Sequence, residues 1–170
     1  FMLVSVPDER ETFRINGDRM TPGISVSNSE VGLAALSIST FTLRLICTNG
    51  MISKTEVSAS YRHVSDKLLS KLPSVLNELK AGFGQQREQF QISLESKVEN
   101  PEATIENFNR QFELRKEEKE AVEWALAQEY GFTMFAVVNT YTKAAQYELL
   151  SAESRFRLQK VGGMVLGMVS

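Results

Sequence analysis

Polar and hydrophobic residues alternate along the first third of the chain, with the period of two that is typical of half-buried β-strands. In the clearest case, Phe41, Leu43 and Cys47 fall on one face of an extended segment, and Thr42 and Arg44 fall on the other. The connections are too short for helical crossovers, so the strands are expected to pair antiparallel. About five strands are predicted, at residues 2–6, 11–15, 23–27, 41–47 and 55–62. Asn-Gly dipeptides at 16–17 and 49–50 are predicted to form tight turns.

From about residue 64 the hydrophobic period lengthens to three and four residues, which predicts helices. Asn100 followed by Pro101 is a helix start, because asparagine caps the first turn and proline fits its first position. Pro73 is expected to kink or restart the first helix, and the ambiguous segment 132–142 is assigned to a helix. The hydrophobic stripe of the first helix comprises Leu68, Leu69, Leu72, Val75, Leu76 and Leu79.

This order of elements predicts an α+β fold, in which an N-terminal antiparallel sheet is followed by a C-terminal helical layer. With 170 residues the chain is long enough for one sizeable core. Residues 1–170 are therefore expected to form a single domain, strand-rich over 1–63 and helical over 64–170. The chain opens on Phe1, with neither an initiator methionine nor a charged leader, and we expect it to be part of a longer protein.

Composition excludes several classes of chemistry. With one cysteine, Cys47, and one histidine, His63, the chain can form no internal disulfide and has few of the ligands that zinc prefers. No metal is therefore predicted. No cofactor is predicted either, because the glycines at 82 and 84 lack both the preceding strand and the later glycine or lysine of a phosphate-binding loop. No hydrophobic run approaches the roughly 20 residues that span a bilayer. We expect a cytoplasmic protein without a membrane partner.

Three features have a chemical interpretation beside a structural one. Cys47 with His63 would make a nucleophile and a base, but a cysteine on a hydrophobic strand face is more often a small buried residue. Glu30 lies in a polar interruption of the sheet region, which forms either a turn or a polar site. The charged run 115–120 mixes both signs and is expected to be a solvated helix face.

Three glycines, Gly162, Gly163 and Gly167, interrupt the hydrophobic C-terminal segment. Glycine costs about 1 kcal/mol relative to alanine inside a helix, so its repeated use predicts the close approach of another backbone. The sheet of this chain is the expected partner. A second subunit is the alternative, which makes a homo-oligomer one of the predicted assemblies.

Basic residues gather near the last two predicted strands and the start of the first helix. Hairpin pairing would bring them together as a groove for the phosphates of single-stranded DNA or RNA. In the structural alternative, Arg44 and Arg62 pair with Glu30 and Glu56. The candidate nucleic-acid-binding residues are Arg44, Lys54, Arg62, His63 and Lys67.

Several motifs resemble a known family. The segments Asn-Ser-Glu-Val-Gly at 28–32 and Leu-Arg-Leu-Ile-Cys-Thr-Asn-Gly-Met at 43–51, with Arg-His at 62–63, resemble the phage and plasmid-like protein family catalogued as DUF932, a domain of unknown function. The segment 139–146 is similar to its C-terminal signature, although alanine is usual where Thr140 stands. The residues that carry the resemblance are Asn28, Ser29, Glu30, Gly32, Arg44, Cys47, Asn49, Gly50, Asn139, Thr142 and Arg155.

That family has no established activity, so the resemblance implies only a setting, the mobile genetic elements of bacteria. Three functions are open. The first is a non-enzymatic protein that binds or anneals single-stranded nucleic acid. The second is an enzyme that acts on nucleotides or nucleic acid through Glu30, Arg44, Asn49 and His63, although these form no complete catalytic set. The third is a protein-interaction or oligomeric scaffold.

Overall fold

The computed structural model describes residues 2–28, 36–44, 49–52 and 66–169. The strand predicted at 55–62 and the end of the strand predicted at 41–47 lie outside these residues. All described strand pairs are antiparallel. The strands are β1 (Met2–Pro7), β2 (Phe13–Ile15), β3 (Asp18–Asn28), β4 (Leu36–Arg44) and β5 (Asn49–Ile52).

The sheet follows the path β1-β3-β4-β5, and the three-residue β2 pairs with the first residues of the long strand β3. A short 3-10 helix, η1 (Glu9–Glu11), separates β1 from β2. Because β1 and β2 pair with successive parts of β3, they lie on the same side of it. The predicted α+β fold, an antiparallel sheet followed by helices, is confirmed.

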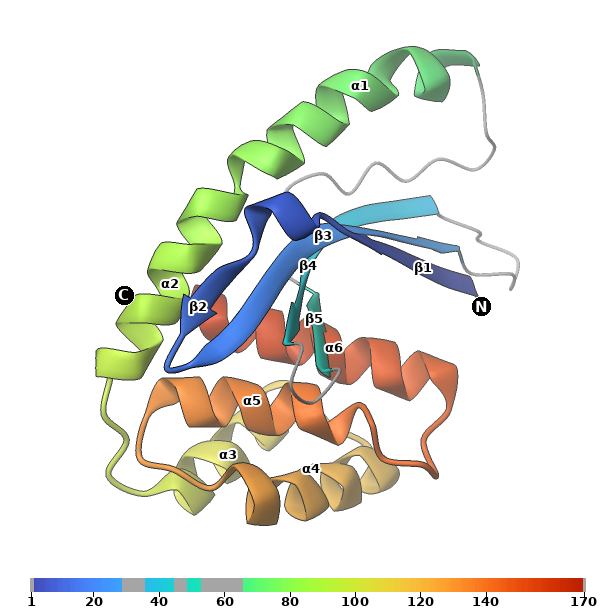
Figure 1. Cartoon of the computed structure of the whole chain (residues 1–170). Helices are drawn as coiled ribbons and strands as arrows, with labels where there is room; N and C mark the ends of the chain where they lie inside the picture. Colours follow the sequence, from blue (N-terminus) through green and yellow to red (C-terminus); the bar gives the residue numbers. More distant parts are fainter. Residues whose placement is uncertain (1, 29–35, 45–48, 53–65, 170) are drawn as a thin grey trace.

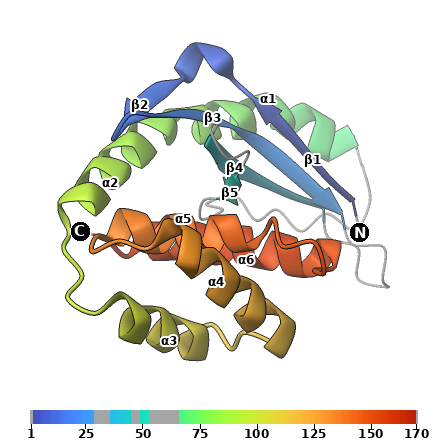
Figure 2. The ribbon, with the colours of Figure 1, turned by 60° about the horizontal axis from the view of Figure 1, so that its bottom comes forward.

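Helices make up the second half of the chain. They are α1 (Asp66–Ala81), α2 (Phe83–Glu95), α3 (Pro101–Gln111), α4 (Lys116–Glu129), α5 (Met134–Ala144) and α6 (Ala152–Gly167). Asn100 caps α3 as predicted, since its Oδ1 accepts from the N–H of Ala103 at 2.9 Å. The ambiguous segment 132–142 falls largely in α5, as assigned. In Figure 2 the sheet lies above α5 and α6, with α2 along one end and α3 and α4 beyond. None of the helices described is long and hydrophobic enough to cross a membrane.

The main hydrophobic core joins the β2–β3 hairpin to α2 and to the helices that follow. Phe90 of α2 lies inside it, with its ring centroid 6.1 Å from that of Phe13 and 6.3 Å from that of Phe135. The same face of the sheet meets α2 again where Gln86 donates to Thr40 and accepts from Thr42. Hydrophobic burial and two buried side-chain hydrogen bonds therefore fix α2 on the sheet.

The first helix departs from its prediction in its packing. It continues past Pro73 as one helix, so it does not restart there. Among its described stripe residues only Leu79 is buried, whereas Leu72, Val75 and Leu76 remain partly exposed. No described residue of α1 belongs to the main core. The amphipathic period is real, but α1 extends away from the body of the fold (Figure 1), so the period does not report a core position.

Two further predictions are wrong. Asn49 and Gly50 form no turn but lie in β5, opposite Arg44 and Leu43, because strand pairing has already begun there. Gly167 is exposed, and a Cβ on it would meet nothing within 4 Å, so it makes no close backbone contact with the described residues. Gly162 and Gly163 are buried in α6, and the close approach of another backbone to them stays a prediction.

Candidate functional site: the β1 edge and its pocket

The predicted cationic groove can be judged at one position. Lys54, Arg62 and His63 lie outside the described residues, and the structure describes only the backbone of Lys67, near the start of α1. Arg44 stands at the end of β4 with a described side chain. The structure therefore does not show whether these five residues come together.

Arg44 is held between two carboxylates. Its Nε donates to Oδ2 of Asp18 at 2.6 Å, and its Nη1 donates to Oε2 of Glu129 at 2.9 Å. Burial lowers the pKa of Arg44, but the hydrogen bonds and charges of Glu129 and Asp18 outweigh it, so the pKa is raised. The guanidinium links β3 and β4 to the end of α4. This is a structural network, as in the alternative considered for Arg44, although neither acid is one that was named for it.

With two carboxylates against one guanidinium, the immediate surroundings of Arg44 carry a net charge of about −1. A phosphate would have to displace a carboxylate from a site that is already mostly buried. Arg44 is therefore a poor phosphate ligand, and nucleic-acid binding stays a prediction that rests on the other four residues.

The residues of the family resemblance have structural contacts where they are described. Asn139 and Thr142 are buried in α5, and the Oγ1 of Thr142 donates to the Asn139 carbonyl at 3.1 Å. Arg155 of α6 donates to the carbonyls of Ala145, Glu148 and Leu150, in the connection before its own helix. It therefore fixes the α5–α6 connection.

The remaining motif residues carry no side-chain description. Asn28 lies at the end of β3, and Asn49 and Gly50 begin β5. The others fall outside the described residues and are Ser29, Glu30, Gly32 and Cys47. Where the structure describes side chains, it contains no group of three or more His, Cys, Asp or Glu that could hold a metal ion.

A scan of the chain against protein-family models finds no matching family. Searches of the curated proteins and of the solved structures return no match either. The resemblance to DUF932 stays a prediction, and the site must be argued from geometry alone.

The first strand of the sheet is exposed over residues 4–7. β1 stands at the end of the strand path and pairs only with β3 in the region described. The N–H of Asp8 donates to the carbonyl of Pro22 at 2.8 Å, which continues the β1–β3 register. Hydrogen-bonded and non-hydrogen-bonded pairs alternate in an antiparallel ladder. Even-numbered residues of β1 therefore turn their backbone groups toward β3, and odd-numbered residues turn theirs outward.

The outward groups form a row along the open edge. They are the N–H and C=O of Leu3, the N–H and C=O of Ser5, and the C=O of Pro7, which has no N–H. No other described strand pairs with them. The side chain of Ser5 turns toward Ser25, with 3.1 Å between the two Oγ atoms, as expected of a non-hydrogen-bonded pair. This edge is a template for one more strand.

One face of the sheet becomes exposed toward this edge. In β4, Thr42 is fully buried against α2, whereas in β3 Ile24 and Val26 on the same face are only half-buried. In β1, Val4 and Val6 are 48% and 63% exposed. Hydrophobic side chains thus line the outer margin of the sheet without a cover among the described residues.

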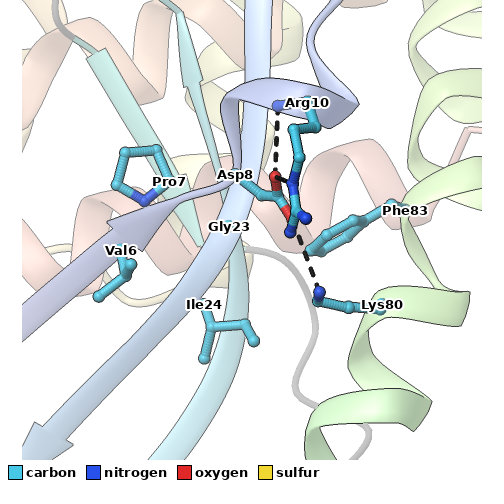
Figure 3. Close-up of a pocket in the computed structure, with 8 residues that line it drawn as sticks. All are labelled: Val6, Pro7, Asp8, Arg10, Gly23, Ile24, Lys80 and Phe83. Carbon is cyan, nitrogen blue, oxygen red and sulfur yellow. Dashed lines mark hydrogen bonds and ion pairs between the residues drawn. The ribbon is translucent and has the colours of Figure 1, made fainter.

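A pocket of about 280 Å³ lies where this margin meets the junction of α1 and α2. Its walls include the side chains of Val6, Ile24 and Phe83, and its rim carries Asp8 with the cations Arg10 and Lys80 (Figure 3). The remaining lining residues are Pro7 and Gly23. The pocket combines a hydrophobic wall with charged groups, which is the composition expected of a recognition site.

Local sequence explains the position of the rim. Asp8 caps η1, because its Oδ1 accepts from the backbone N–H of Arg10 at 3.2 Å. Gly23 lets the end of β1 come close, since a Cβ there would meet the Val6 carbonyl oxygen and lie 2.8 Å from Pro7 Cα. Asp8 therefore makes the last contact of the β1–β3 ladder at the edge of the pocket, and η1 begins directly after it.

Charge at the rim is unbalanced. Arg10 donates from Nε and Nη2 to the two oxygens of Asp8, both at 3.0 Å, and Nζ of Lys80 lies 3.6 Å from Asp8 Oδ2. The hydrogen bond from Arg10 is the main reason that the pKa of Asp8 is lowered, so Asp8 stays ionised at neutral pH. Among the residues that line the pocket, two cations against one anion give a net charge of about +1.

The sequence pattern predicts β1 but does not indicate this site. An uncharged strand such as Met2–Pro7 is expected in the middle of a sheet as well as at its edge. Its composition therefore does not show which of the two positions β1 takes. Lys80 is separated from Asp8 by 72 positions, and the two meet only because the C-terminal end of α1 lies beside the sheet. No local pattern connects the two.

Proposed function

We propose that this protein is an interaction module that receives an extended peptide segment as an additional strand at β1. The observation that carries the proposal is the row of outward backbone groups at Leu3, Ser5 and Pro7, which no other described strand pairs. Only an extended chain presents donors and acceptors at the matching spacing. The proposal develops the interaction-scaffold hypothesis and keeps the cytoplasm as its setting.

In the part described, the strand has few of the devices that usually protect a sheet edge. Such edges carry lysines, inward charges or bulges, whereas Met2–Pro7 contains no charged residue and its register with β3 is continuous. Only Pro7, at the end, blocks pairing. The exposed side chains of Val4 and Val6 offer hydrophobic contacts to an added strand.

The test uses two substitutions at one residue. Ser5→Pro removes the outward N–H and keeps every backbone bond to β3, because proline is tolerated on an edge when its nitrogen faces solvent. Ser5→Ala removes only the hydroxyl. An immobilised library of random octapeptides is the probe. We expect peptides that bind the wild type and Ser5→Ala and bind Ser5→Pro at least tenfold more weakly.

Two controls keep the outcome informative. Urea unfolding reports whether Ser5→Pro is folded; if it is not, Val6→Lys replaces it, since a charge on this exposed side chain opposes strand addition without affecting the core. Binding that is unchanged in the edge variants, or no enriched peptide at all, contradicts the proposal. Concentration-dependent dimerisation that Ser5→Pro abolishes would show that a second copy of the chain pairs with β1. It would contradict the proposal that the added strand comes from a separate peptide.

A further inference from the structure

We infer that the segment received at β1 carries an acidic side chain opposite Asp8 and a hydrophobic one opposite Val6. In an antiparallel added strand this is an aspartate or glutamate two residues before a hydrophobic residue. The inference rests on the proposed function and adds the chemistry of its partner. It is carried by the pocket, which shares Val6, Pro7 and Asp8 with the edge strand.

Register decides which side chains of the added strand reach the pocket. With Ser5 in a hydrogen-bonded pair, the residues opposite Val6 and Asp8 lie on the same face of the sheet as Val6 and Asp8 themselves. Opposed side chains on one face have Cβ atoms about 5 Å apart. The added-strand residue opposite Val6 therefore lies beside the exposed side chain of Val6, at the mouth of the pocket. The added-strand residue opposite Asp8 lies beside the charged rim.

Charge complementarity selects the residue opposite Asp8. Asp8 is already satisfied, since Arg10 contacts both of its oxygens through the side chain and one through the backbone. Lys80 has three donors and meets Asp8 only at 3.6 Å, with its side chain 49% exposed. A carboxylate on the added strand neutralises the net positive rim by binding Lys80, whereas a basic side chain would add a third cation.

A second copy of this chain does not supply that carboxylate. In an antiparallel pair of β1 strands centred on Ser5, the residue opposite Asp8 is Met2 of the second copy. Residues 1–7 contain no acid at all. The charge of the rim therefore favours a different protein as the partner, and self-association is one of the outcomes that the test separates.

The experiment repeats the octapeptide selection on charge variants. Lys80→Glu reverses the rim charge, Asp8→Asn makes the rim more positive, and Lys71→Glu is the matched control, an exposed lysine of α1 that does not line the pocket. Wild type and Lys71→Glu should enrich an acid two residues before a hydrophobic residue. Asp8→Asn should enrich it further, and Lys80→Glu should exchange the acid for lysine or arginine.

A synthetic copy of the most enriched octapeptide measures how much the acidic side chain contributes to the affinity. Replacing its acid by the corresponding amide should weaken binding about twofold to fivefold at low salt, and added salt should remove the difference, as for other exposed ion pairs. If peptides bind through Ser5 but show no acid preference, or keep it in Lys80→Glu, this inference fails and the proposed function stands. If no peptide binds the wild type, both fail.

Discussion

Arg157 donates from Nη1 to both carboxylate oxygens of Glu118, at 3.0 and 3.1 Å, although the Glu118 side chain is fully buried. The same carboxylate accepts from the Oγ of Ser154 at 3.0 Å and from the backbone N–H of Arg115 at 3.0 Å. Glu118 thus caps its own helix, α4, and joins it to α6. A buried carboxylate is tolerated here because its oxygens have these partners.

Removal of this carboxylate should destabilise the fold. Glu118→Ala leaves the Ser154 hydroxyl buried without its acceptor and opens a cavity between α4 and α6, and we expect a loss of about 3 kcal/mol in the free energy of unfolding. Glu117→Ala, at the exposed neighbouring position, should change it by less than about 0.5 kcal/mol. Urea unfolding of both variants measures the difference, and equal losses would show that the network adds nothing.

Glu118 also shows where sequence analysis stops. The run 115–120 was expected to be a solvated face, and Arg115, Lys116, Glu117, Lys119 and Glu120 are indeed exposed. Glu118 can be buried because residues of α6 pair with its carboxylate. The first of these residues along the chain is Ser154, which lies 36 positions after Glu118. Periodicity describes one helix at a time and contains no information about such a partner.

The same limit explains which parts of the fold could be predicted. Alternation located β1, and the Asn100-Pro101 start located α3, because both depend on local residues. Whether β1 is central or at the edge depends on sheet order, which the short connections leave open. The candidate site at Asp8 and Lys80 exists only once α1 and β1 are placed together, so it could not be found from either segment.

Arg44 supports a second prediction. Arg44→Ala leaves Asp18 and Glu129 facing each other as partly buried like charges, so the fold should lose about 2–3 kcal/mol of stability, measured by urea unfolding. Arg14→Ala, at an exposed arginine of β2, is the control and should leave the free energy of unfolding nearly unchanged.

Fluorescence anisotropy with labelled single-stranded DNA, on variants that remain folded, should show no specific loss of DNA binding for Arg44→Ala. A selective loss would return Arg44 to the nucleic-acid hypothesis.

Gly23 gives a third prediction, because the ring of Phe41 occupies the space where its side chain would be. A Cβ on residue 23 would lie 2.5 Å from Cε1 of Phe41 and 2.8 Å from Cα of Pro7. Gly23→Ala should therefore separate β1 from β3 and cost at least the 1–3 kcal/mol typical of overpacking. Gly84→Ala is the matched control, since a Cβ there meets nothing within 4 Å and alanine favours the helix by up to about 1 kcal/mol. Thermal unfolding that fails to separate the two variants contradicts this account.

Amide hydrogen exchange tests the open edge in the free protein. The N–H groups of Val4 and Val6 bond to β3 and should exchange slowly, whereas those of Leu3 and Ser5 point outward and should exchange much faster. Exchange resolved by residue, recorded by NMR, gives the comparison within one strand. Slow exchange at Leu3 and Ser5 in the free protein would show that the edge is already paired and remove the basis of the proposed function.

The last prediction concerns Tyr141, whose single hydroxyl proton is shared between two acceptors inside the core, the Ile105 carbonyl oxygen at 3.1 Å and Oδ1 of Asn109 at 2.8 Å. Burial raises the pKa of this phenol well above its ordinary value of 10.0. Above about pH 10 the phenol ionises in the unfolded chain but not in the folded one. The free energy of unfolding therefore falls by about 1.4 kcal/mol for each further pH unit until the pKa of the folded state is reached.

At about pH 8 Tyr141→Phe should be about 1 kcal/mol less stable than the wild type, because it loses the hydrogen bonds. At about pH 11 that gap should close or reverse, since phenylalanine does not ionise. Urea unfolding at the two pH values measures the gap, and an equal gap at both would contradict the raised pKa.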